Sequence, residues 1–241
     1  MSDSDLTDIS MAAFWLVWGK AFTLATTRKT KAAGEGRFNK QDWINAAVQI
    51  LVAESIDHVK VHVLAKKLGV SRSSFYWQFA TIQDLHTELI DYWLEQNTGP
   101  IIERATRPAP TITKSICNLF ECWVDRDLFD PQLDIAIRFW GRLDPAISAV
   151  VDQADNQRID ALTRMFVRYD YQPEEAFTRA RVLYFTQIGH YTLGLRESEE
   201  ARLSHLHSYL ITFTGREPAA GEIEMFSKFV RKWLEKQSKA A

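Results

Sequence analysis

A short run of polar and aromatic side chains, RSSFYWQ at residues 72–78, has the residue types that recognise nucleic acid. An arginine at position 72 can donate two hydrogen bonds to a guanine. Ser73 and Ser74 are small enough for close approach and can hydrogen-bond bases or phosphate. The rings of Tyr76 and Trp77 can lie against a sugar–phosphate wall and offer donors from their edges. These residues therefore predict a DNA-contacting element.

Catalytic chemistry has no comparable set of residues in the sequence. No nucleophile–base pairing, phosphate-binding loop or helical metal-ligand spacing is present in the sequence. The His205-Leu206-His207 triplet is too short to indicate a metal site. We therefore expect no enzymatic activity, no metal and no cofactor.

The elements that must position the run at 72–78 have the pattern of a helix-turn-helix. We expect one short helix over residues 61–68, a tight turn over 68–71 and a second short helix over 71–78. Gly69, four residues after Ala65, permits a left-handed turn, while the small alanine lets the second helix pack closely. Ser71 can cap that helix. A chance corner between two helices is the structural alternative.

Consecutive residues of a helix cannot all point to the same side, which separates the aromatic side chains of this segment. Phe75 and Phe79 are expected to face the core, and Tyr76 and Trp77 to face outwards, although burial of all of them is the alternative. The first helix of the motif should cross the DNA backbone near its start, where His62 could touch phosphate or be a surface histidine without a role. The predicted DNA-binding residues are Lys60, Val61, His62, Arg72, Ser73, Ser74, Tyr76, Trp77 and Gln78.

Charge is unevenly distributed along a chain of 241 residues whose formal net charge is −2. Residues 28–79 hold nine Lys/Arg and four Asp/Glu, a net +5, which leaves −7 for the rest. A basic segment joined to an acidic body is typical of a protein that brings one region to phosphate, although a solvated basic surface gives the same count. The two cysteines, Cys117 and Cys122, fall in an apolar helical pattern and predict buried free thiols, which suit a reducing cytoplasm.

The whole chain has helical periodicity, with no convincing strand pattern, so we predict an all-α fold. Residues 1–36 form an extension that ends in a basic linker; an extra docked helix and a start codon placed too early are both open. The apolar part of that extension is shorter than the about 20 residues that a membrane span needs. A DNA-binding domain is expected over residues 37–97 and a larger regulatory and dimerisation domain over 98–241, with Thr98-Gly99-Pro100 breaking the helix between them.

Helix starts are marked by capping residues along the chain. Asn39 with Asp42, and Thr81 with Asp84, are predicted to cap the helices that follow them. Asp-Pro pairs at 130–131 and 144–145 and the proline at 173 open three further helices. Ser198 is predicted to cap a shorter helix that runs through Leu210.

The segment LAKKLGVSRSSFYWQF at 64–79, with Asp84-Leu85 after it, closely resembles the DNA-binding domain of the tetracycline-repressor (TetR) family of transcriptional regulators. The resemblance covers residues 37 to about 96 and is much less specific beyond them. It implies a homodimer that binds a palindromic operator in double-stranded DNA, with repression relieved by a small molecule in the carboxy-terminal domain. It also places Tyr76 at a position that commonly contacts phosphate.

Two departures from the family pattern bear on DNA affinity. Gln78 stands where many members have His, and it can still donate a hydrogen bond to phosphate. Ile82 stands where many have Lys or Arg, so we predict weaker binding with a less steep salt dependence. Arg28, Lys29 and Lys31 could compensate from the linker, or could simply be solvated there.

The carboxy-terminal region should hold a ligand pocket and a dimer interface. The predicted pocket residues are Trp123, Trp140, Tyr184, Gln187, His190 and Tyr191, and a fairly apolar or aromatic effector is expected. Gln187 lies on an apolar face and needs a partner, which could be an effector or another side chain. Arg138 is expected to pair within its own helix. For the dimer, the helix at 173–195 is predicted to pack with that at 221–237, burying the faces of Ala180 and Trp233.

Two other classes of function remain open at this stage. An all-α enzyme or small-molecule carrier is one alternative, and a protein-interaction module that has lost specific DNA binding is the other. Loss of duplex binding on substitution of Tyr76 or Trp77 would favour the regulator.

Overall fold

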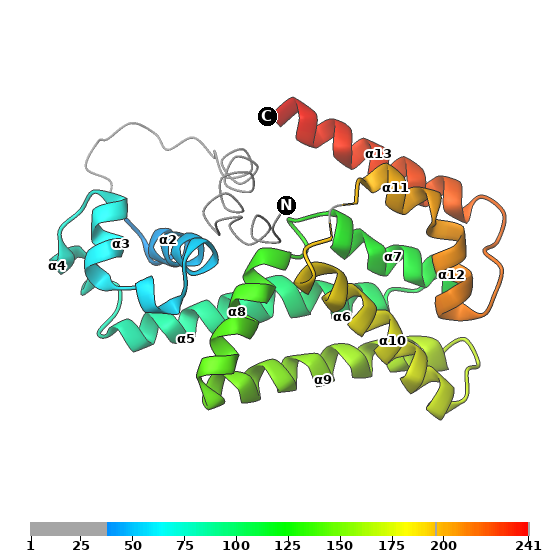
Figure 1. Ribbon diagram of the computed structural model, residues 1–241, viewed down its shortest axis with the longest axis horizontal. Helices are drawn as coiled ribbons and strands as arrows, with labels where there is room; N and C mark the ends of the chain where they lie inside the picture. The colour runs from blue at the N-terminus through cyan, green and yellow to red at the C-terminus, as the bar shows by residue number, and fades with distance from the viewer. Residues whose placement is uncertain (1–37, 196, 241) are drawn as a thin grey trace, which may run out of the picture.

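The computed structural model describes residues 38–195 and 197–240, and these residues are helical with no strand among them (Figure 1). Both the all-α prediction and the two-part architecture, a helix-turn-helix region followed by a larger helical body, are confirmed. The amino-terminal helices are α2 (Lys40–Ala53), η1 (Ile56–His58), α3 (Val61–Leu68), α4 (Arg72–Phe75) and α5 (Ile82–Trp93). The others are η2 (Leu94–Thr98), α6 (Gly99–Thr106), α7 (Ile112–Val124), α8 (Pro131–Leu143), α9 (Pro145–Val167), α10 (Pro173–Thr192), α11 (Glu199–Ser204), α12 (Leu206–Thr214) and α13 (Glu222–Ala240).

Local capping chemistry starts the helices where the sequence predicts. The Asn39 side chain accepts a hydrogen bond from the backbone N–H of Asp42, and Asp42 accepts one from the backbone of Asn39, at 3.1 and 2.8 Å. Thr81 and Asp84 form the same reciprocal box at the start of α5. Such boxes satisfy N–H groups that have no partner inside the helix.

Two expected breaks differ from the structure. The helix does not stop at Thr98-Gly99-Pro100, because the π-helical turn η2 carries it from α5 directly into α6. The N–H of Gly99 donates to the carbonyl of Leu94, and this wider register accommodates the proline, which has no N–H to donate. The helix capped by Ser198 ends earlier than predicted, at Ser204, and α12 begins after a turn at His205.

Two apolar cores lie at opposite ends of the molecule. The amino-terminal core gathers side chains of α2 to α5 but also takes in Leu133, Ile137 and Trp140 from α8 and the first part of α9. The second core is formed by α6, α7, most of α9, α10, α12 and α13. A boundary between residues 97 and 98 would therefore cross a continuous helix and leave α8 serving the amino-terminal core. The division at that point stays a prediction.

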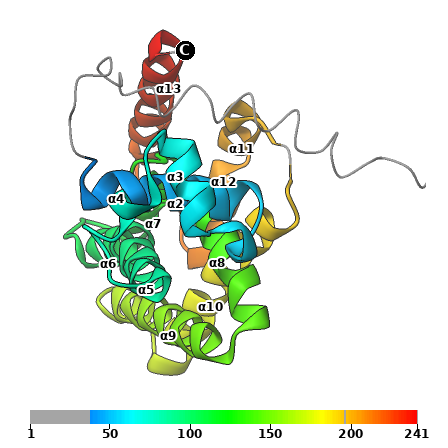
Figure 2. The same cartoon turned by 90° about the vertical axis from the view of Figure 1, so that its left-hand side faces the viewer.

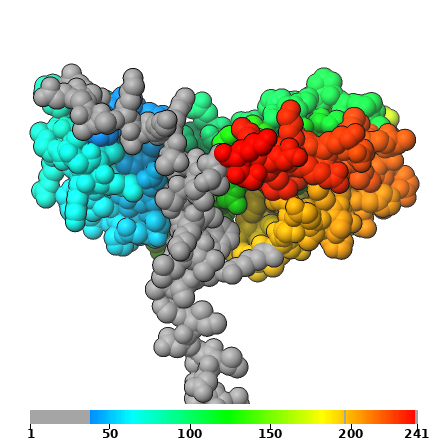
Figure 3. All heavy atoms as spheres, turned by 90° about the horizontal axis from the view of Figure 1, so that it is seen from above, coloured from blue at the N-terminus to red at the C-terminus, as the bar shows by residue number. Residues whose placement is uncertain are grey.

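The arrangement leaves the helix-turn-helix region projecting from one end of the body. Figure 2 looks onto this end, with α2, α3 and α4 in front, and Figure 3 shows the same region separated along the long axis from α12 and α13. Within the described residues, no helix is long and apolar enough to cross a membrane. The predictions for residues 1–36, including Arg28, Lys29 and Lys31, fall outside the described residues.

Candidate nucleic-acid interface and ligand cavity

The turn between α3 and α4 has the geometry predicted for a helix-turn-helix. Gly69 ends α3 in the left-handed conformation, with φ 70° and ψ 30°. The N–H of Val70 donates to the carbonyl of Ala65 at 3.0 Å, which closes the turn, and Ala65 is buried where the two helices meet. A residue with a Cβ would be strained at position 69. One glycine and one small side chain thus set the angle between the helices.

The second helix is fixed to the core by its aromatic residues. Phe75 is fully buried and packs edge-to-face on Trp43, with ring centroids 5.3 Å apart. Phe79 is also buried and stacks on Phe75 at 5.2 Å. Because these rings hold α4 against α2, the opposite side of α4 is held facing solvent.

The exposed side of α4 carries the residues predicted to meet DNA. Tyr76 is 59% exposed and Trp77 is 73% exposed, whereas their neighbour Phe75 is 0% exposed. Arg72 and Ser73 are exposed as well. The helix is shorter than predicted, since α4 ends at Phe75 and residues 76–78 form a turn. The outward and inward assignments of the aromatic residues nevertheless agree with the structure.

The serines of α4 are linked to one another. Ser71 occupies the N-cap position, but its side chain makes no capping hydrogen bond, so the predicted capping role is wrong. Its hydroxyl oxygen instead lies 2.8 Å from that of Ser73 and 3.2 Å from that of Ser74. Three hydroxyl groups within hydrogen-bonding distance at a helix start can turn outwards to an incoming phosphate oxygen.

Positive charge surrounds this surface. Lys60, Lys66, Lys67 and Arg72 are exposed, and none of them has an ion-pair partner among the residues that the structure describes. His62, on α3, is exposed too. Val61 is half-buried and packs against the amino-terminal core, so its side chain supports the fold. Unneutralised cations beside exposed aromatic rings form a surface suited to a phosphate backbone.

Gln78 and Ile82 take structural positions beside this surface. The Gln78 side-chain amide donates a hydrogen bond to the backbone carbonyl of Phe38 at 3.2 Å, which ties the turn after α4 to the chain entering α2. Ile82 is half-buried at the first position of α5 and packs against the amino-terminal core. Neither role was foreseen from the sequence, because each depends on segments brought together by folding.

The comparisons with known proteins agree with this geometry. A family model described as "Bacterial regulatory proteins, tetR family" matches residues 44–89, which run from α2 through the helix-turn-helix into α5. The chain carries a tetR-family DNA-binding domain. The protein is therefore a DNA-binding transcriptional regulator, and the predicted resemblance is confirmed.

Two solved structures align with most of the regulator's length at low similarity. One is described as a possible TetR family transcriptional regulator from Streptomyces coelicolor A3(2); it is 15% identical, covers 84% of this chain and 100% of its own, with a TM-score of 0.37. The other is BioQ of Mycobacterium smegmatis, which is 18% identical and covers 85% of this chain and 99% of its own, with a TM-score of 0.34. No curated protein matches the chain.

A buried ionic network lies between the regulator's amino-terminal core and its body. Arg158 of α9 is 0% exposed and donates to Asp134 of α8 at 3.1 Å and to the hydroxyl of Tyr184 of α10 at 2.9 Å. It also donates to the hydroxyl of Thr98, in the π-helical turn, at 2.9 and 3.0 Å. The Nε1 of Trp93, at the end of α5, donates to Asp134 at 2.9 Å. Helices from both ends of the molecule therefore meet at one guanidinium and one carboxylate.

The network extends to a second ion pair. Arg138 pairs with Asp134 in its own helix, as predicted. It also donates to Asp155 of α9 at 2.8 and 2.7 Å and to the hydroxyl of Tyr184 at 2.9 Å. Burial alone would raise the pKa of Asp134, but the guanidinium groups of Arg158 and Arg138 outweigh it and hold that pKa below its usual value. Arg142, four residues after Arg138 in the same helix, forms no ion pair among the described residues. Sequence analysis missed the network because its members are spread over four α-helices and the π-helical turn.

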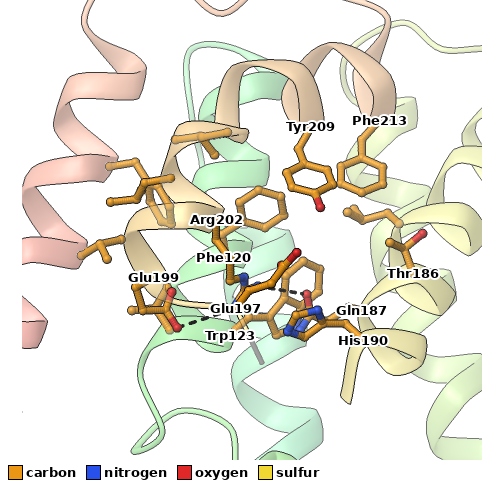
Figure 4. A pocket seen from close by; sticks show the side chains of 16 residues that line it. Phe120, Trp123, Thr186, Gln187, His190, Glu197, Glu199, Arg202, Tyr209 and Phe213 are labelled. Atoms are coloured by element: carbon orange, nitrogen blue, oxygen red, sulfur yellow. Dashed lines mark hydrogen bonds and ion pairs between the residues drawn. The ribbon is translucent and has the colours of Figure 1, made fainter. Parts of the chain in front are cut away.

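The regulator's body contains a small cavity of about 70 Å³ between α7, α10, α11, α12 and α13 (Figure 4). Trp123, Gln187 and His190 line it, as predicted for a ligand pocket. The other three predicted pocket residues do not. Trp140 packs on His86 in the amino-terminal core, and Tyr184 is engaged in the ionic network.

Tyr191, the third residue outside the lining, stacks on Phe129 at 5.6 Å. The sequence placed it on the same helical face as Gln187, and that face is buried as expected. This face of α10 is long, however: Gln187 lies at the cavity, whereas Tyr191, one turn further on, packs in the core. Arg202 and Glu199, which also line the cavity, were not foreseen because they come from the separate helix α11.

Proposed function

We propose that the protein is a sequence-specific repressor that binds a palindromic operator as a homodimer and is released by a small-molecule effector. The single observation that carries the DNA-binding role is the exposure of Arg72 on α4 and of Tyr76 and Trp77 in the turn directly after it, a segment held by the buried Phe75. A helix this short can enter a major groove about 12 Å wide with its first residues at the base edges.

The exposed residues divide into two proposed roles. Arg72 donates to a guanine and Ser73 and Ser74 hydrogen-bond bases or nearby phosphate, which supplies sequence preference. Tyr76 and Trp77 lie along the sugar–phosphate wall. Lys60, His62 and Gln78 complete the proposed contact set around the phosphate backbone, with Gln78 using the amide hydrogen that Phe38 does not take. Val61 is not proposed to contact DNA, because its side chain packs against the amino-terminal core.

A mobility-shift titration tests the proposal. The DNA is the stretch just upstream of the protein's own coding region, with excess nonspecific DNA and several salt concentrations. Tyr76→Ala combined with Trp77→Ala is expected to weaken specific binding by at least about tenfold, a free-energy loss of about 1.4 kcal/mol. Phe139→Ala removes another exposed aromatic side chain, from α8, and is the control.

Specific binding that survives the double substitution, with the helical content unchanged, would refute the proposed role of α4. If no specific complex forms with that DNA, selection from random duplexes decides whether another operator exists. Failure of that selection would favour the alternative function, an all-α small-molecule-binding or protein-interaction protein that has lost specific DNA binding. The proposal gives the chain no enzymatic role and places it in the cytoplasm, where buried free thiols such as Cys117 and Cys122 are stable.

The dimer interface proposed here differs in part from the predicted one. Ala180 is 0% exposed within a single chain, so its face cannot pack against a partner. Helix α10 packs against α9 and α12, while α13 packs mainly against α7. The apolar side chains that α10 exposes are Phe177, Val182 and Phe185, each between 45% and 49% exposed, and Tyr209 of α12 lies on the adjoining helix.

A second copy of the chain is therefore proposed to cover the exposed face of α10 and α12, which keeps α10 in the interface and replaces α13. The Phe185→Asp variant is expected to sediment as a monomer at concentrations where the unmodified protein is a dimer. Met225→Asp on α13, where the side chain is 52% exposed, is the control and should leave the dimer intact. The reverse result would restore α13 to the interface.

Release from the operator by an effector requires that the helical body be structurally coupled to the helix-turn-helix. The ionic network offers one, because Tyr184 of α10 and Thr98 of the π-helical turn both bind Arg158. A ligand that displaces α10 would alter the anchorage of the helix that continues into α5. Release then follows if the ligand binds the displaced state more tightly than the DNA-bound state.

A further inference from the structure

The cavity beside α10 has an aromatic wall with a polar cluster on one side. The aromatic lining residues are Phe120, Trp123, Tyr209, Phe213 and Phe226. Figure 4 shows Gln187, His190, Arg202 and Glu199 gathered at the other side, with Arg202 between Gln187 and Glu199. An occupant of this cavity would have an apolar, flat part and one polar group.

Gln187 holds a buried hydrogen-bond donor that has no partner. The residue is 7% exposed, and its side-chain nitrogen makes no hydrogen bond within the described part of the chain. The hydroxyl of Tyr191 is also buried; it is near enough to interact with Gln187, but it forms no hydrogen bond of normal geometry within the described residues. The side-chain oxygen of Gln187 accepts a hydrogen bond from Arg202, but at the long distance of 3.5 Å. Since buried polar groups are almost always hydrogen-bonded, an unused amide N–H at a cavity wall indicates that an acceptor is missing there.

Arg202 is also loosely held. Its only ion-pair partner within residues 38–195 and 197–240 is Glu199, with a nitrogen–oxygen distance of 3.6 Å. Charge-assisted hydrogen bonds of arginine with carboxylates are normally about 2.7–2.9 Å long. Burial raises the pKa of Glu199 in spite of the nearby Arg202, so this carboxylate is a poor permanent partner. Burial and the charge of Arg202 lower the pKa of His190 below its usual value, which favours the neutral imidazole.

We propose that this cavity binds a small aromatic carboxylate, whose ring lies among the aromatic side chains and whose carboxylate takes hydrogen bonds from Arg202 and from the side-chain nitrogen of Gln187. This deepens the proposed function, because the ligand would be the effector. Binding replaces the loose Arg202–Glu199 contact with a shorter, bidentate one. Since the cavity is smaller than the about 300–1,000 Å³ of most ligand pockets, the occupant is a single-ring acid or one that widens the site on entry.

The main alternative class of ligand for this cavity is an aromatic cation. Glu197 and Glu199 both line the cavity, and aromatic rings also attract organic cations. The geometry favours the carboxylate because the most deeply buried polar group, Gln187, presents an unused donor, while Glu197 is exposed and accessible to water.

Calorimetric titration of the full chain with three probes of one shape separates these classes. Phenylacetate, phenylacetamide and phenethylamine carry a negative, a neutral and a positive group on the same ring. We expect phenylacetate to bind at least about tenfold more tightly than either of the others. Arg202→Gln and Gln187→Leu should each weaken phenylacetate binding by about tenfold or more, because each removes one donor to the carboxylate.

Arg164→Gln, which removes an exposed arginine of α9 that is not among the cavity's lining residues, is the control and should bind phenylacetate as the unmodified protein does. Tighter binding of phenethylamine, equal binding by the Arg202→Gln variant, or binding of none of the three probes would each overturn the proposal. Operator binding measured in parallel keeps the two proposals apart. Carboxylate binding that leaves the operator complex intact refutes the effector role but not the site, and loss of specific DNA binding without ligand refutes only the proposed function.

Discussion

Replacing Asp134 with leucine removes one charge from the fully buried part of a network that is neutral as a whole. Asp134 and Asp155 supply two negative charges, and Arg138 and Arg158 supply two positive ones. Asp134→Leu leaves a net charge of +1 in this network. Arg138 keeps its two hydrogen bonds to Asp155, but Arg158 retains only that carboxylate, at 3.8 Å, as an ionic partner.

The expected cost follows from the burial of Arg158. Removing one partner of a buried ion pair costs about 3–5 kcal/mol, since the remaining charge is left in a medium that solvates it poorly. Asp134 also accepts from the indole nitrogen of Trp93, which would lose its partner. For a chain of this size, such a loss corresponds to a fall in Tm of about 6–20 °C. The double variant Asp134→Leu with Arg158→Met restores neutrality and is expected to recover most of the loss.

The assay is thermal and urea unfolding of the unmodified protein, the two single variants and the double variant, followed by circular dichroism. A coupling energy of about 2 kcal/mol or more between the two positions is expected. Asp160→Asn breaks the exposed Asp160–Arg164 pair on the same helix and should cost less than about 0.5 kcal/mol. Additive effects of the two single substitutions would refute the account of the network.

Acid titration gives a second test of the same carboxylate. The pKa of Asp134 is lowered in the folded state, so its stabilising contribution is present above the unfolded value of about 3.9 and is lost as pH falls through the folded pKa. The difference in stability between the unmodified protein and Asp134→Leu should therefore be constant near pH 7 and shrink only on strong acidification. A difference that already shrinks between pH 8 and pH 6 would contradict this assignment.

Three further predictions follow from single positions. Gly69→Ala should lower the free energy of unfolding by about 1–2 kcal/mol, because φ is +70° there, although no atom lies within 4 Å of the added Cβ. The control Gly189→Ala, inside α10, should be neutral or slightly stabilising. Equal effects of the two substitutions in urea unfolding would contradict the conformational argument. Ile82→Lys should raise operator affinity and steepen the log K against log salt slope by about 1, and an unchanged slope would show that position 82 lies away from phosphate. Burial raises the pKa of the Cys117 and Cys122 thiols to about 12, so both should stay unreactive towards a thiol reagent at pH 8 until the protein unfolds, and rapid labelling of the native protein would contradict their burial.

Much of the DNA-binding region could be predicted because its determinants are local. A capping box joins residues three positions apart, as with Thr81 and Asp84, and the turn at Gly69 depends on one backbone conformation. The outward direction of Tyr76 and Trp77 follows once the buried side of the helix is known from Phe75. Each of these inferences uses the geometry of a single helical turn, which the sequence carries directly.

Predictions that depended on neighbouring helices were less accurate. Local propensity placed a break at Thr98-Gly99-Pro100, but the tertiary contacts of Asn97 and Thr98 hold a π-helical turn there instead. Gln187 and His190 were correctly placed at a cavity, whereas Trp140 belongs to the other core. Periodicity identifies a buried face but does not say which helix will cover it.

The sequence by itself determined that this is a helical DNA-binding protein, where its capped helices begin, and which side of α4 meets solvent. The tertiary structure alone decided how the charges were paired. Arg158 meets Thr98 across 60 positions of sequence and Tyr184 across 26, and the Gln78 amide reaches Phe38 across 40. The physical reason is range: a cap or a turn is satisfied within a few residues, whereas a buried charge is stable only beside partners that helix packing brings together from distant segments.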